Sequence, residues 1–258
     1  MCIRDSFNPN RFTDSAGTPW EGRSFDENPF SQDDGKASPE LVEAIAAFRA
    51  GKLGAEVVVD RIRVSRLLVP LLANLGESEI GAHGQKVDKS AELSIVTVKS
   101  PDDQDSLVVF SSVEAMNKWN KTSRPVPTDA IRVALAAASQ MSTRIVLDPG
   151  SETEFVVRRP AIAKIAQSQP WLPAEKNPSV LQVLEDSVAG EPLVVGFEAS
   201  TADPQSRLLG AELQVSFQLQ PKAEPSLVRE LIERVSSKWS QSEEFATSVD
   251  SVAIKLRS

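Results

Sequence analysis

The chain has 258 residues, 41% of them apolar and 25% charged, which is ordinary for a globular protein and long enough for one large or two modest domains. Its 28 basic and 36 acidic residues give a net charge of −8, and no long part is basic, so neither a nucleic-acid partner nor binding to an anionic membrane is expected. A single cysteine, Cys2, and a single histidine, His83, exclude an internal disulfide and the common metal sites, so we expect no metal and no cofactor.

The start of the chain carries no apolar stretch that resembles a secretory signal. The longest run without a polar side chain, residues 67–73, is far shorter than the roughly 20 residues of a membrane span. We therefore expect a cytoplasmic protein.

Residues 1–6 (MCIRDS) look like a translated sequencing adapter of the kind found in metagenomic gene models, and they carry no functional argument here.

Residues 1–38 are predicted to form an irregular amino-terminal arm, because residues 7–38 are polar, rich in glycine and proline, and without helical or strand periodicity. The arm is nevertheless rich in aromatic residues, which disordered tails usually lack. We expect Trp20 and Phe30 to anchor it on the folded body.

Residues 39–170 are predicted to form a first α+β domain. Ser38 and Pro39 begin a helix that ends at Gly51, whereas residues 55–62 fit either a helix or a strand. Pro70 is expected to mark an edge or a bulge of a strand at 66–73, and His83 to lie in a loop at 74–89. Further elements are expected in this order: an antiparallel pair of strands at 91–98 and 107–110, a helix at 113–119, an extended segment at 124–127, a helix capped by Thr128 with Ile131, Leu135, Ala138 and Met141 buried, a hairpin of 144–147 with 154–157, and a short helix at 160–166.

Residues 171–258 are predicted to form a second α+β domain after a linker at 168–178 that contains three prolines. The expected elements are a helix ending at Gly190, strands at 193–197 and 211–219, an amphipathic helix at 227–239 and a last strand at 252–256. The second strand alternates strictly, which places Glu212, Gln214, Ser216 and Gln218 on a wet face. The fold class is therefore α+β, with two small domains, each a mixed or antiparallel sheet covered by helices.

Short motifs stand in a definite order along the first domain: Trp20-Glu21-Gly22-Arg23, Asp33-Asp34-Gly35, Arg66-Leu67-Leu68-Val69-Pro70, Asp88-Lys89, Phe110-Ser111-Ser112-Val113-Glu114-Ala115 with Trp119, Arg124-Pro125-Val126-Pro127, and Arg158-Arg159-Pro160. This order resembles the SseB family, named after enhanced serine sensitivity, in its actinobacterial form. The resemblance covers residues 20–170, and residues 177–258 resemble the carboxy-terminal SseB domain in pattern. It implies no catalytic residues.

The candidate sites are few. The chain has no glycine-rich phosphate loop and no nucleophile elbow, and no catalytic residue stands out. His83 is expected to be a solvated loop residue, Asp33 and Asp34 to form a turn rather than a cation site, and Arg158 and Arg159 to be a solvated strand end.

Three hypotheses for the function follow. The first is a non-catalytic protein-interaction module whose partner surface contains Trp20, Arg23, Trp119 and Arg124, because tryptophan and arginine are enriched at binding hot spots. The second is a small-molecule sensor, in which Arg66, Lys89 or Arg124 receives the carboxylate of an amino acid. The third is an enzyme using Asp/Glu acid–base chemistry, although no carboxylate pair is picked out by spacing. The sequence identifies neither the partner nor the oligomeric state.

Overall fold

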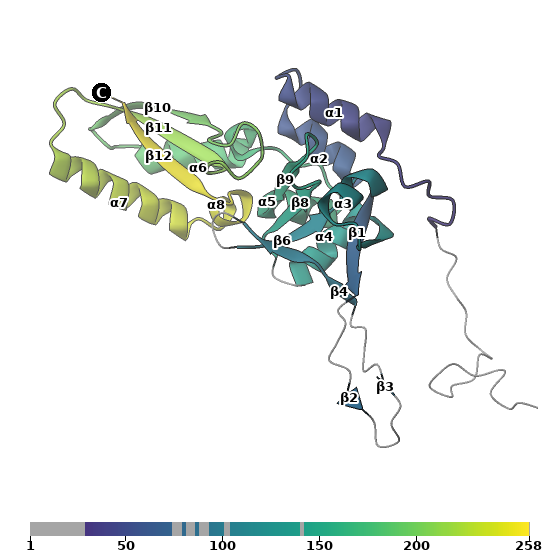
Figure 1. Cartoon of the computed structure of the whole chain (residues 1–258). Coiled ribbons are helices and arrows are strands. Elements are labelled where there is room, and N and C mark those ends of the chain that lie inside the picture. The colour runs from purple at the N-terminus through teal and green to yellow at the C-terminus, as the bar shows by residue number, and fades with distance from the viewer. Residues whose placement is uncertain are drawn as a thin grey trace, which may run out of the picture. The chain divides into compact units, whose positions relative to one another are not determined.

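The computed structural model describes residues 29–73, 79–80, 86–87, 93–100, 104–139 and 142–257 (Figure 1). Residues Asp34–Ser258 form one compact unit. It holds two separate hydrophobic cores, one within residues 41–165 and the other within 174–249, and we call residues 34–170 the first lobe and 171–257 the second lobe. Helices and mixed sheets in both lobes confirm the α+β class.

The first lobe begins with two helices, α1 (Pro39–Arg49) and α2 (Ala55–Arg63). The predicted cap of α1 is present, since Ser38 Oγ accepts from the Leu41 backbone N–H at 3.4 Å, and Gly51 follows the helix with a φ of +70°. The undecided segment is helical, and it buries Val58, Val59 and Ile62 on one face. The spacing of these residues fits a helix in contact with the core.

A four-stranded sheet of order β5-β6-β8-β9 forms the centre of the first lobe, and only β6 and β8 are parallel. Its strands are β5 (Thr97–Lys99), β6 (Asp105–Val109), β8 (Arg144–Leu147) and β9 (Phe155–Arg158). One face packs on α1, α2, α4 (Ala130–Ser139) and α5 (Arg159–Ala166). On the other face Val108 and Phe110 pack beneath α3 (Val113–Trp119). The predicted hairpin of β8 and β9 is confirmed.

A second sheet has the order β4-β1-β7, with strands β1 (Arg66–Ala73), β4 (Leu93–Ile95) and β7 (Arg124–Asp129). The predicted strand at 91–98 is therefore divided, because β4 pairs with β1 whereas β5 pairs with β6. Residues Glu79–Ile80 (β2) and Lys86–Val87 (β3), expected to be loop, pair as a short ribbon.

Pro70 lies in the central strand of this sheet, so its expected place at an edge or bulge is wrong. On one side it stands opposite Pro125 of β7. On the other side Phe110 bonds to Leu68, and pairing with β4 begins only at Leu71. The position of Pro70 lies between these two partners, where no neighbouring strand requires a hydrogen bond from its backbone nitrogen. The missing N–H therefore costs no hydrogen bond of the sheet.

Helix α4 buries a different face from the one predicted. Ala130, Val133, Ala134 and Ala137 are buried, whereas Leu135 is 54% exposed. The small alanine side chains allow the helix to lie close to α5, so the face with the smaller residues is turned inward. The cap is Asp129 rather than Thr128, since Asp129 Oδ1 accepts from the Arg132 N–H at 2.8 Å.

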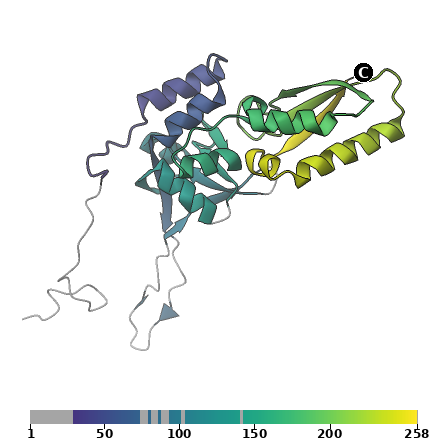
Figure 2. The same ribbon diagram turned by 180° about the vertical axis from the view of Figure 1, so that it is seen from behind.

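The second lobe has a sheet of order β10-β11-β12, in which β11 and β12 are parallel. Its elements are α6 (Pro178–Val188), β10 (Val194–Ser200), β11 (Leu213–Leu219), α7 (Pro225–Gln241), α8 (Glu243–Ser248) and β12 (Val252–Arg257). The three helices contact one another and cover one face of the sheet (Figure 2).

Two details of the second lobe differ from the sequence predictions. Helix α8 was not expected, and it places Phe245 against Trp239 with ring centroids 5.3 Å apart. A register shift in β10 turns Val195 outward, so that it is 56% exposed although the alternation predicted it to be buried. Within the residues described, none of the helices combines the length and the apolar character needed to cross a membrane.

Candidate functional site

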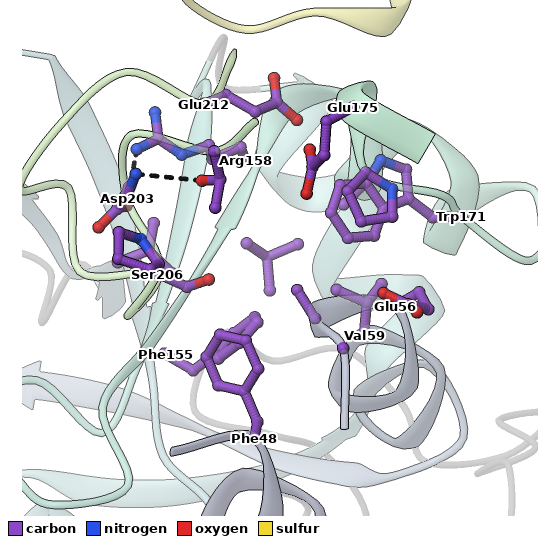
Figure 3. A pocket seen from close by; sticks show the side chains of 18 of the residues that line it. Phe48, Glu56, Val59, Phe155, Arg158, Trp171, Glu175, Asp203, Ser206 and Glu212 are labelled. Carbon is purple, nitrogen blue, oxygen red and sulfur yellow. Dashed lines mark hydrogen bonds and ion pairs between the residues drawn. The ribbon is translucent and has the colours of Figure 1, made fainter. Parts of the chain in front are cut away.

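A cavity of about 210 Å³ lies between the two lobes (Figure 3). The first lobe contributes α1, α2, β9 and α5, and the second lobe contributes the segments around residues 171–176, 201–206 and 212. A backbone hydrogen bond joins the two lobes beside the cavity, since the Val156 N–H of β9 donates to the Ser206 carbonyl at 2.8 Å. The cavity is larger than the roughly 150 Å³ apolar cavity that is known to take a benzene molecule.

One wall of the cavity is apolar. Phe48, Val59, Phe155 and Ala161 line it, and the rings of Phe48 and Phe155 meet edge to face with centroids 5.5 Å apart. Trp171 comes from the segment between the lobes, and its ring stands on the other side of the same space (Figure 3). This arrangement suits an apolar body with a flat or extended shape.

Glu212 is a deeply buried acid of the cavity, with 5% of its surface exposed. Its Oε2 accepts from the Asp250 backbone N–H, and its Oε1 has no partner among the described residues. Its pKa is raised to about 7, chiefly by burial, and the nearby carboxylates of Asp250 and Glu175 contribute in the same direction. The Asp250 N–H and the Arg158 charge act in the opposite direction.

Glu175 and Glu56 also line the cavity, as does Asp203, which belongs to an ion-pair network. Burial raises the pKa of Glu175, whose Oε2 has no partner among the residues described. Glu56 accepts from Lys176 Nζ through Oε1 at 2.8 Å, while its Oε2 is buried without a partner in the described part of the chain. The Trp171 indole N–H is likewise buried and unpartnered there. Four polar atoms, three carboxyl oxygens and one indole N–H, therefore have no partner among the described residues around a single cavity.

A buried ion-pair network forms the remaining wall. Arg158, 8% exposed, donates through Nη2 to Asp203 at 2.8 Å and to the Gly210 carbonyl at 2.7 Å. Its Nη1 donates to Asp250 at 3.0 Å, and Arg144 reaches the same Asp250 oxygen at 3.2 Å. The network ties β9 of the first lobe to two segments of the second lobe, so the expectation that Arg158 is a solvated strand end is wrong. Two carboxylates hold its guanidinium in place.

Residues 41–164 match the family model described as the SseB protein N-terminal domain. The chain is a member of the SseB family. Among curated proteins and among solved structures, no protein matches the chain. The SseB domain supplies Phe48, Glu56 and Arg158 to the cavity, whereas Trp171, Glu175 and Glu212 come from the chain beyond it.

The residues that the sequence singled out in the SseB domain do not line this cavity. Trp119 is half-buried against Phe110, with ring centroids 5.4 Å apart. Arg124 is exposed on β7, where it lies opposite Leu71 of β1, and its side chain makes no hydrogen bond or ion pair within the described residues. Arg66 donates to the carbonyls of Ser111 at 2.8 Å and Lys36 at 2.6 Å, so it fastens the segment before α1. Trp20, Arg23, Lys89 and His83 lie outside the described residues.

Other expectations outside the cavity have mixed outcomes. Asp34 accepts from the Lys36 N–H at 2.9 Å, as a turn would predict, and no three Asp, Glu, His or Cys side chains of the described residues gather as metal ligands. Arg159, expected to be solvated, donates to the carbonyls of Ala246 and Val249 at 2.6 Å each. On the predicted wet face of β11, Gln218 is exposed but Ser216 is buried. Glu212 was assigned to this face too, yet it precedes the strand and turns into the cavity.

Proposed function

We propose that this SseB-family protein is a non-catalytic binding protein that holds a small molecule in the cavity between its lobes. The observation that supports it is the group of four unpartnered polar atoms, on Glu56, Trp171, Glu175 and Glu212, around one cavity. Buried polar groups in folded proteins are nearly always hydrogen-bonded. A ligand that supplies the missing partners would gain binding free energy at each of these atoms.

The protein would act as a sensor, because a ligand held by both lobes stabilises the contact between them. Ligand binding to the folded state alone raises the free energy of unfolding by about 2.7 kcal/mol at a hundred times the dissociation constant. From the sequence we expected the small molecule to bind at Arg66, Lys89 or Arg124. The site proposed here is a different one, since Arg66 and Arg124 do not line the cavity.

Thermal unfolding of the full chain against a panel of amines, amino acids, nucleotides and carboxylates tests this proposal. We expect at least one class to raise the melting temperature. Trp171→Phe, which removes the unpartnered N–H and keeps an aromatic ring, should reduce that increase, whereas Trp119→Phe should leave it unchanged. A flat response of the unmodified chain across the whole panel would reject the proposal.

A protein-interaction role is the second candidate, and the exposed Arg124 supports it. Arg124 lies on β7, at an edge of the β4-β1-β7 sheet, next to the 37% exposed Val126. Trp20, Arg23, Trp119 and Arg124 would form the partner surface. A pull-down at near-cellular salt should then recover a stoichiometric protein that Arg124→Glu releases, and recovery of none would count against this role.

Acid–base catalysis by carboxyl groups stays a third hypothesis, because the cavity does bring Glu175 and Glu212 together with raised pKa values. Turnover of a bound molecule that Glu212→Gln abolishes would favour it over binding alone. We also propose, on the sequence alone, a cytoplasmic location, no nucleic-acid partner, and a carboxy-terminal SseB-like domain at residues 171–258.

A further inference from the structure

We propose that the ligand of the interlobe cavity is a small organic cation, with a protonated amine or guanidine carried on a short apolar body. This rests on the proposed function, since it names the chemistry of the molecule that the cavity takes. Three independent features of the described residues carry it: the charges of the lining, the type of its unpartnered atoms, and the aromatic rings that face them.

The charges that line the cavity favour a cation. Glu56, Glu175 and Glu212 contribute three carboxyl groups. The two lining cations are both engaged: Arg158 binds Asp203 and Asp250, and Lys176 binds Glu56. An anionic ligand would have to break one of these pairs, and breaking the buried Arg158 pairs would leave a carboxylate uncompensated. A cationic ligand could bind the carboxyl groups without breaking the ion pairs of Arg158.

The unpartnered atoms need donors. Three of the four are carboxyl oxygens, and an ammonium or guanidinium group carries only donors. The hydrogen bonds that it would form are charge-assisted, which are the stronger kind. The Trp171 N–H is the exception, since it is a donor and would donate to an acceptor atom of the ligand. A carboxylate ligand would instead place like charges together.

The rings and the volume limit the rest of the ligand. Trp171, Phe48 and Phe155 face the same space, and aromatic faces attract cations that are taken out of water. The volume of about 210 Å³ exceeds the roughly 150 Å³ of a cavity that takes benzene, so the apolar body of an aliphatic or arylalkyl amine fits it.

Titration calorimetry of the full chain with two matched sets of probes tests the inference. The first set is phenethylamine, 2-phenylethanol and phenylacetate, and the second is butylamine, 1-butanol and butyrate. We expect saturable binding of an amine, at least tenfold tighter than that of its alcohol and carboxylate analogues. Near pH 7 the amine should release protons, because a bound cation favours the ionised form of Glu212.

Matched variants locate the binding. Glu212→Gln should weaken amine binding tenfold or more and abolish the proton release, whereas Glu185→Gln, an exposed acid of α6, should change neither. Glu56→Gln offers a second test at a less buried position, and there too the amine affinity should fall.

The possible failures are distinct. An alcohol or a carboxylate that binds as tightly as its amine would overturn the cation inference and leave the proposed binding function standing. Amine binding that both Glu212→Gln and Glu56→Gln leave intact would place the cation elsewhere and also overturn it. If neither these probes nor the broader panel binds, the proposed function itself fails.

Discussion

The substitution Glu212→Gln should make the protein more stable at neutral and alkaline pH. Glu212 is 95% buried in a cavity wall, and its ionised form is disfavoured there by burial and by the carboxylates of Asp250 and Glu175. Glutamine has nearly the same shape and keeps an oxygen that can accept from the Asp250 N–H. The variant therefore removes the buried charge while it keeps the contact.

The magnitude follows from proton linkage. The pKa of the carboxyl rises from 4.5 to about 7 on folding, so between these values the folded state binds a proton that the unfolded state has lost. The stabilisation by this proton is complete below pH 4.5 and is lost as the pH rises through 7. At about 1.4 kcal/mol per pKa unit, the loss amounts to about 3 kcal/mol in the unmodified protein.

Urea unfolding followed by tryptophan fluorescence at pH values from 5 to 8 measures this effect. The free energy of unfolding should fall with pH in the unmodified chain relative to Glu212→Gln, and the difference between the two should approach about 3 kcal/mol at pH 8. Glu185→Gln should follow the unmodified protein throughout. A difference between Glu212→Gln and the unmodified chain that does not vary with pH would refute the reasoning.

Three further predictions concern other parts of the structure and are tested by the same urea assay. Arg158→Met should destabilise the fold by about 3–5 kcal/mol, because it removes the arginine that pairs with the buried Asp203 and leaves Asp250 with Arg144 alone. Arg257→Met, at the exposed pair with Glu198, should cost less than about 1 kcal/mol, and equal effects of the two substitutions would contradict the buried network. Asp148→Ala should cost about 3 kcal/mol, since it removes the acceptor of the Ser111 N–H, the Ser111 hydroxyl and the Thr153 hydroxyl; a loss below about 1 kcal/mol would be too small for that role. Val133→Ala should destabilise the protein by more than about 1 kcal/mol, because Val133 is buried, and Leu135→Ala by less than about 0.5 kcal/mol. A larger effect of Leu135→Ala would instead support the buried face of α4 that was predicted from the sequence.

The elements predicted correctly are those that local chemistry determines. Ser38, Pro39 and Gly51 set both ends of α1, and the turn at 148–150 sets the hairpin of β8 and β9. Asp148 and Gly150 both adopt positive φ there, which aspartate and glycine tolerate better than most residues. Such signals need no knowledge of the rest of the fold.

The predictions that were wrong concern features that depend on tertiary packing. The inner face of α4 depends on how closely α5 approaches, and the helical spacing of apolar residues alone selected the face with Ile131 and Leu135 instead of the face with Val133, Ala134 and Ala137. The strand pairing of Pro70 depends on where β4 begins, which the sequence does not mark. The parallel pairing of β11 and β12 likewise depends on the return of the chain through α7 and α8.

The candidate site was not predictable for the same reason. Glu56, Glu175 and Glu212 are far apart in the sequence, and each looks like an ordinary surface acid. Glu212 continues the polar alternation of β11, which assigned it to the wet face. Only the packing of the second lobe against β9, held by Arg158, brings the three carboxyl groups to one cavity.

A crystal structure of the full chain grown with phenethylamine tests the central claim most directly. The account predicts the amine nitrogen within hydrogen-bond distance of the Glu212 carboxyl, with the ring between Trp171 and Phe48. A cavity that holds only water molecules bonded to these polar atoms, at saturating amine, would contradict it.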